Sequence, residues 1–121
     1  MAEIINSKRY DLEDRTLKYT RDAISLINGT PNTLANSEII KQLVRSSCSV
    51  GANYIEANGA LGKKDFAMRI RICRKEAKES KFWLNLITLD NQDLENQRQS
   101  MIKEAEELTR IFNAILEKTQ T

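Results

Sequence analysis

Residues that interrupt helices are scarce in this chain of 121 residues, and all of them except Gly51 stand in two clusters. Pro31 is the only proline and follows Gly29, while Gly59 and Gly62 mark a second break. Proline cannot continue a helix, and glycine disfavours a helix interior. The long stretches between these breaks therefore favour long helices over many short strands.

Apolar residues recur at helical spacing within each stretch. We expect one domain, residues 1–121, with helices at about residues 11–28, 37–58, 63–89 and 92–118. Short connections between the last three helices make them antiparallel neighbours. The sequence therefore predicts an all-α fold, an antiparallel up-down-up-down four-helix bundle.

The ends and the core face of these helices can also be predicted. We expect Gly29 to end the first helix in a left-handed conformation and Asn36 to cap the second. Asp90 or Asn91 is expected to cap the fourth helix. The predicted core face of the first helix consists of Leu17, Ala23, Ile24 and Ile27.

Charge is distributed unevenly between the last two helices. Residues 63–81 hold eight basic residues and three acids, whereas residues 90–118 hold four basic residues and seven acids. At about 100° per residue, seven of the eight basic side chains fall within an arc of roughly 120°. This set, the basic stripe, consists of Lys63, Lys64, Arg71, Arg74, Lys75, Lys78 and Lys81. Aliphatic residues fall opposite, so this helix is predicted to have a core side and a cationic side.

Three interpretations of the basic stripe are open from the sequence. A dense row of cations favours an anionic partner such as RNA or DNA. The stripe is alternatively a solvated helix face, although apart from the pair Lys75 and Glu79 few acids stand four residues away to pair with its cations. A third interpretation is docking onto the acidic fourth helix of another subunit. For nucleic acid, little sequence readout is expected, because no aromatic residues interleave with the cations for stacking.

The apolar part of the third helix is wider than a monomeric bundle requires. Its non-basic arc spans about 200°, roughly twice the usual width. The additional apolar surface predicts self-association, or alternatively it covers one end of the bundle. In the second helix, small residues let a neighbouring backbone come close. Six residues are thus predicted at an oligomer contact or a helix crossing: Ser47, Gly51, Tyr54, Ile72, Trp83 and Leu86.

Polar residues near the small-residue segment are predicted to satisfy one another across helices. The set consists of Arg45, Asn53, Glu56, Glu76 and Glu79. Such a hydrogen-bond network fixes the register of a bundle, and a ligand site is the alternative.

The chain contains no histidine, which removes the usual catalytic and metal-binding patterns. Cys-His and Ser-His nucleophile pairs, histidine zinc sites and Glu-x-x-His di-iron sites are all excluded. The clustered carboxylates have arginines and lysines nearby as partners. We therefore predict no enzymatic activity, no catalytic residue, no metal site and no cofactor.

No apolar stretch is long enough for a membrane span, and the first residues show no secretory signal. We expect a cytoplasmic protein without a membrane partner. Cys48 and Cys73 are then expected to be two buried free thiols rather than a disulfide.

Several segments together resemble a known protein family. Residues 10–16 resemble the family's opening segment, and residues 42–57 its characteristic second helix. Residues 64–66 and 73–84 resemble its third helix. The family consists of bacterial four-helix-bundle proteins named for intervening sequences in 23S rRNA, and the resemblance covers about residues 9–118.

The resemblance implies a four-helix bundle that assembles as a homopentamer. A similar protein is the accessory subunit of diversity-generating retroelements, a basic pentamer that engages reverse transcriptase and nucleic acid. The implied partners are the chain itself, RNA or DNA, and another protein. We therefore predict a non-enzymatic homo-oligomer that binds nucleic acid through the basic stripe. The alternative is a protein-interaction scaffold whose stripe docks another protein or subunit.

Overall fold

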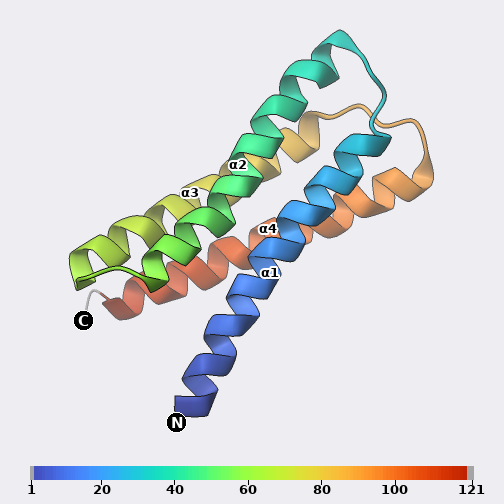
Figure 1. The fold of residues 1–121 in the computed structure, drawn as a ribbon. Helices are drawn as coiled ribbons and strands as arrows, with labels where there is room; N and C mark the ends of the chain where they lie inside the picture. Colours follow the sequence, from blue (N-terminus) through green and yellow to red (C-terminus); the bar gives the residue numbers. More distant parts are fainter. Residues whose placement is uncertain (1, 120–121) are drawn as a thin grey trace.

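The computed structural model describes the backbone of residues 2–119 and the side chains of residues 12–119. Within this range the chain is all-α, with four helices and no strand. The helices are α1 (Ala2–Gly29), α2 (Leu34–Asn58), α3 (Lys63–Leu86) and α4 (Gln92–Thr119), joined by short loops (Figure 1).

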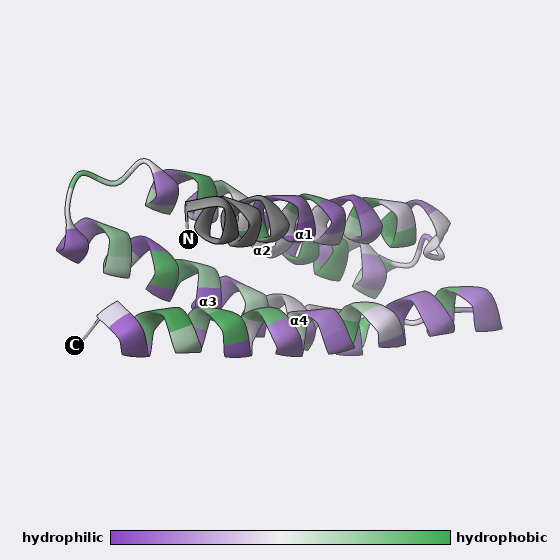
Figure 2. Ribbon diagram, turned by 90° about the horizontal axis from the view of Figure 1, so that it is seen from below, coloured by the Kyte–Doolittle hydropathy of each residue, from purple (hydrophilic) through white to green (hydrophobic). Residues whose placement is uncertain are grey.

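Residue numbers run in opposite senses on helices that pack together. On α2 and α3, Arg45 contacts Glu76, whereas Asn53, further along α2, contacts Arg69, nearer the start of α3. The pairs α1–α2, α3–α4 and α1–α4 show the same order. In Figure 1 the chain accordingly turns back at each loop. Figure 2 shows α1 and α2 in one layer and α3 and α4 in the other.

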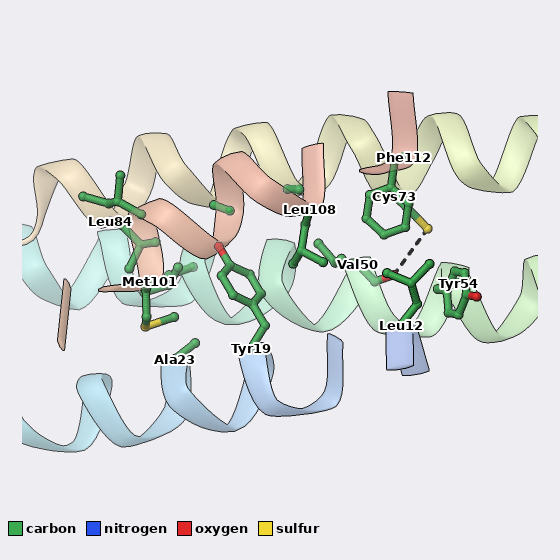
Figure 3. Packing of buried hydrophobic residues seen from close by; sticks show 14 of the residues in the cluster. Leu12, Tyr19, Ala23, Val50, Tyr54, Cys73, Leu84, Met101, Leu108 and Phe112 are labelled. Atoms are coloured by element: carbon green, nitrogen blue, oxygen red, sulfur yellow. Dashed lines mark hydrogen bonds between the residues drawn. The ribbon is translucent and has the colours of Figure 1, made fainter. Parts of the chain in front are cut away.

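Side chains from all four helices fill the space between the two layers (Figure 3). Ala23, Leu43, Ile70 and Leu108 are fully buried. The ring centroids of Tyr54 and Phe112 lie 6.2 Å apart and join α2 to α4. Burying a large apolar side chain stabilises a fold by about 1.5–3 kcal/mol. This core is therefore the main source of stability.

The core face of α1 differs from the prediction. Leu17 and Ile24 are 49% and 46% exposed, so placing them in the core was wrong. The buried row instead consists of Leu12, Thr16, Tyr19, Ala23 and Leu26. Thr16 and Tyr19 in this row are polar, so the apolar residues alone did not indicate which face of α1 is buried. Each finds an internal partner, because the Thr16 hydroxyl donates to the carbonyl of Glu13 and the Tyr19 hydroxyl bonds to Ser80.

Gly29 ends α1, but not in the predicted conformation. No glycine in the described range has a positive φ, so the expected left-handed cap was wrong. A Cβ atom at Gly29 would lie 2.9 Å from Cδ2 of Leu94. The glycine therefore allows the start of α4 to pack closely against the end of α1.

Asn36 also has a role different from the predicted one. Thr33 is the N-cap of α2, because its hydroxyl accepts from the backbone N–H of Asn36 at 3.1 Å. The Asn36 side chain is buried and donates to the carbonyls of Pro31 and Thr88 at 2.9 and 3.0 Å. Its Oδ1 accepts from the N–H of Thr88 at 3.0 Å. Asn36 thus ties the loop before α2 to the residues after α3.

The remaining helix ends are simpler. Asn91 caps α4 as predicted, since its Oδ1 accepts from the N–H of Leu94 at 2.9 Å. The third helix ends at Leu86, earlier than expected, and Ile87 is already extended while still packing into the core.

The two cysteines lie in different surroundings, and both are free. Cys73 is buried and its thiol donates to the carbonyl of Val50 at 3.4 Å (Figure 3). Burial raises the pKa of Cys73 to about 12. Cys48 is exposed on α2, so the expectation of two buried thiols was wrong for this residue.

Candidate nucleic-acid interface

All seven residues of the basic stripe lie on the single uninterrupted helix α3. Five of them are exposed: Lys63, Lys64, Arg71, Lys75 and Lys78. None of these five forms an ion pair with a carboxylate of the described residues. The expected pair of Lys75 with Glu79 is not formed, because Glu79 is bonded to Arg45. The exposed cations are therefore available to an external anion.

The other two residues of the basic stripe lie along the border with α4. Nη1 of Arg74 donates to Oδ1 of Asn113 at 2.9 Å. Nζ of Lys81 lies 3.6 Å from Oε1 of Glu106. These two side chains are partly engaged within the molecule.

An aromatic side chain accompanies the cations, contrary to the prediction. Phe82 is 56% exposed and follows Lys78 by four residues, which places it on the same face of α3. Its ring and that of Trp83 pack in a T-shaped arrangement, with centroids 5.0 Å apart. The indole N–H of Trp83 donates to Glu79 at 3.2 Å, which holds the Trp83 ring that packs against Phe82. The spacing of Phe82 from Lys75 and Lys78 was the signal that could have revealed it.

Beside Phe82 a groove of about 510 Å³ runs between α3 and α4. Its lining consists of Lys78, Lys81, Phe82, Asn85, Glu106, Thr109 and Arg110. Three cations and one acid make this groove electropositive. Arg110 was missed from the sequence because α4 as a whole is acidic.

The predicted polar network is divided into two parts. Arg45 donates to Glu76 at 2.8 Å and also to Glu79, and Glu76 is buried. Separately, Arg69 donates to Oδ1 of Asn53 at 3.0 Å. Both parts join α2 to α3.

Glu56 is exposed and joins neither part of the network among the described residues. In the same range, no three potential metal-ligating side chains lie together. The hydrogen bonds of the predicted network that the described residues form therefore all link α2 to α3 or lie within one of these helices.

The small residues of α2 lie where this helix crosses α1. A Cβ atom at Gly51 would be 3.3 Å from Oγ1 of Thr16, and the Thr20 hydroxyl donates to the carbonyl of Ser47 at 3.0 Å. Ser47 is buried, and so is Tyr54 two turns further along. These three predicted residues, Ser47, Gly51 and Tyr54, thus pack within one chain.

Exposed apolar residues border the seam between α1 and α2. They are Leu17, Ile24, Val44 and Ile55. On α3, Ile72 and Trp83 are half-buried within the chain, whereas Leu86 is exposed. The exposed apolar surface therefore includes a region on α1 and α2 that the sequence did not indicate.

The sequence matches the family of 23S rRNA-intervening sequence proteins over residues 8–114. The chain belongs to this family. A similar solved structure is a protein of unknown function from the S23 ribosomal protein family of Bacteroides thetaiotaomicron. It is 28% identical, with a TM-score of 0.70 over 87% of this chain and 97% of that one. The family resemblance of the second and third helices is thereby confirmed.

A comparison with curated proteins finds no match. None of the described helices is long and apolar enough to cross a membrane.

Proposed function

We propose that this protein is a non-enzymatic homo-oligomer of antiparallel up-down-up-down four-helix bundles that binds RNA or DNA through the basic stripe. The observation that carries the proposal is the row of exposed cations on α3. Five of them have no carboxylate partner among the described residues: Lys63, Lys64, Arg71, Lys75 and Lys78. A nucleic-acid backbone supplies the regularly spaced anions that such a row requires.

Binding of this kind is dominated by phosphates. If three to five of these cations contact phosphates, log K should fall with log salt with a slope of roughly −2 to −4.5. One stripe alone binds weakly at physiological salt. Several stripes on one oligomer raise the apparent affinity by avidity.

The exposed apolar residues at the α1–α2 seam support self-association. Leu17, Ile24, Val44 and Ile55 leave apolar side chains in water that a second copy would cover. A homopentamer is the assembly that the family resemblance implies. Contacts through α1 and α2 would leave the basic stripe on α3 free.

The decisive experiment reverses three exposed charges of the basic stripe. The variant Arg71→Glu, Lys75→Glu and Lys78→Glu should lose binding to labelled RNA and DNA in fluorescence anisotropy. Arg74 is left unchanged because its guanidinium is bonded to Asn113. Far-UV circular dichroism checks that the variant remains folded.

The matched control makes the same change of net charge on the other three helices. Arg21→Glu, Lys41→Glu and Lys103→Glu alter exposed residues of α1, α2 and α4. This variant should retain most of the affinity. Equal losses in both variants would show that binding follows net charge rather than the basic stripe, and would contradict the proposal.

The second candidate function is an interaction scaffold in which the basic stripe docks onto α4 of another subunit. The contact between Lys81 and Glu106 shows that α3 and α4 carry complementary charges. Light scattering coupled to size exclusion distinguishes the two functions. If the stripe joins subunits, the triple Glu variant should have a lower mass than the wild type, and nucleic acid should not be captured by either.

A further inference from the structure

The groove between α3 and α4 combines an aromatic wall with cations. Phe82 lines the groove, and its ring packs edge to face with that of Trp83 at a centroid distance of 5.0 Å. More than half of the Phe82 surface remains exposed although the side chain is large and apolar. Exposed aromatic rings of this kind are platforms on which nucleic-acid bases stack.

The cations at the groove are held only loosely by carboxylates. The Lys81–Glu106 distance is 3.6 Å, and Arg110 lies 3.8 Å from both Glu106 and Glu107. Lys78 has no carboxylate partner in the described range and belongs to both the groove and the basic stripe. A phosphate near the ring would therefore find three cations that can turn toward it.

The size of the groove suits a single nucleotide. Its volume of about 510 Å³ lies within the range of small-ligand sites. The groove continues the line of the basic stripe, because Lys78 and Phe82 lie one helical turn apart on α3. A strand that follows the stripe thus reaches the groove.

We infer that this groove is a subsite for an unpaired nucleotide, with the base on Phe82 and its phosphates on Lys78 and Arg110. The inference rests on the proposed function and specifies its substrate class, single-stranded RNA or DNA. In a duplex the bases are already stacked and paired, so they cannot reach the ring. The basic stripe alone would bind both forms through phosphates, and the groove adds the preference for a single strand.

The test compares a single-stranded oligonucleotide of mixed sequence with its duplex, each as RNA and as DNA, at fixed salt. Phe82→Ala should weaken single-strand binding about 5-fold or more, the loss of one stacked base. Duplex binding should be unchanged. Phe82→Tyr keeps a stacking ring and should restore the single-strand affinity, whereas Phe82→Leu should not.

The matched control is Met68→Ala. Met68 is a large apolar residue of α3 that is 45% exposed, and it lies outside the groove lining. This variant should bind single strands as the wild type does. An equal loss in Met68→Ala and Phe82→Ala would mean that exposed apolar surface, not the groove, carries the effect, and would overturn the inference.

Trp83 gives an independent readout because it is the only tryptophan and touches Phe82. Single strands should change its fluorescence in the wild type, and this change should be lost in Phe82→Ala. If wild-type protein binds single strand and duplex equally and Phe82→Ala alters neither, the inference fails while the proposed function stands. If neither form binds, the proposed function itself fails. If Phe82→Ala weakens polyglutamate binding instead, the groove serves an acidic protein and the inference is overturned.

Discussion

The hydroxyl oxygens of Tyr19 on α1 and Ser80 on α3 lie 2.5 Å apart in the core. Ser80 already donates its proton to the carbonyl of Ala77 at 2.9 Å, so Tyr19 is the donor to Ser80. In the described range α1 and α3 are not neighbouring helices, and this bond reaches diagonally across the bundle. Figure 3 shows the Tyr19 side chain pointing from α1 into the space between the helices. The bond therefore sets the position of α1 relative to the opposite layer.

Replacing Tyr19 by phenylalanine removes the diagonal bond and little else. Ser80 keeps its bond to Ala77, so no buried hydroxyl is left without a partner. We expect a loss of about 1 kcal/mol in the free energy of unfolding, measured by urea denaturation. Ser80→Ala should cost more, about 1–3 kcal/mol, because it leaves the Tyr19 hydroxyl buried and unpaired. The reverse order of the two variants would contradict this arrangement.

Alkaline pH should destabilise the protein through Tyr19 and Cys73. Burial raises the pKa of each to about 12, from ordinary values of 10.0 and 9.0. Above the ordinary values the unfolded chain releases these protons while the folded chain retains them, so the free energy of unfolding falls as pH rises. The fall should begin near pH 9 for Cys73 and near pH 10 for Tyr19, and should level off above about 12.

Tyr19 alone should lower the free energy of unfolding by roughly 2–3 kcal/mol once the pH exceeds its raised pKa. Urea denaturation at pH 8, 10 and 11.5 measures it directly. Tyr19→Phe should be less stable than the wild type at pH 8 but should lose less stability between pH 10 and 11.5. Parallel pH profiles for the two proteins would show that Tyr19 ionises normally in the folded state.

Asn36 and Thr33 contribute differently to stability: Asn36 joins the loop before α2 to the residues after α3, whereas Thr33 only caps α2. Asn36→Ala removes three hydrogen bonds and leaves the backbone groups of Thr88 without them, which should cost roughly 2–4 kcal/mol. Thr33→Ala removes one cap bond and should cost about 1 kcal/mol. Thermal and urea unfolding of both variants measure the difference. A larger loss of unfolding free energy in Thr33→Ala than in Asn36→Ala would show that Asn36 does not stabilise the contact between these two loops.

The presence of four helices and the core side of α3 were predictable because apolar periodicity there is regular, although α1 begins at Ala2 rather than near residue 11. The face of α1 was not, since it includes two buried polar residues: Thr16 lies against Gly51 of α2, and Tyr19 bonds to Ser80 of α3. Asn36 was misassigned for a related reason. An asparagine can cap a helix or bond to a distant backbone segment. Which role Asn36 takes depends on the proximity of Thr88, which the sequence does not reveal.

In the candidate site too, features within one helix were predictable, whereas contacts between helices were not. The positions of the cations on α3 follow from helical spacing alone, and so does the shared face of Phe82. The groove does not, because Arg110 and Glu106 come from α4 and meet Lys81 only once the helices pack. A pattern within one helix can predict a surface, but a groove between two helices depends on their register.

The substitution Gly51→Ala probes how closely α1 and α2 approach each other. Alanine stabilises a helix interior by about 1 kcal/mol relative to glycine. At Gly51, however, the added Cβ would press against Oγ1 of Thr16 at 3.3 Å. Thr16 is buried and its hydroxyl is bonded to Glu13, so it cannot move away freely. We therefore expect Gly51→Ala to bring no net gain in stability in the wild-type background.

The same substitution should behave differently once Thr16 is alanine. Without Oγ1 the added methyl group meets only ordinary contacts, so Gly51→Ala should stabilise the Thr16→Ala variant by up to about 1 kcal/mol. A double-mutant cycle by urea denaturation then gives a coupling of about 0.5–1 kcal/mol between the two positions. Residues that do not touch show additive effects. An additive result here would place α1 further from α2 than the crossing at Thr16 and Gly51 requires.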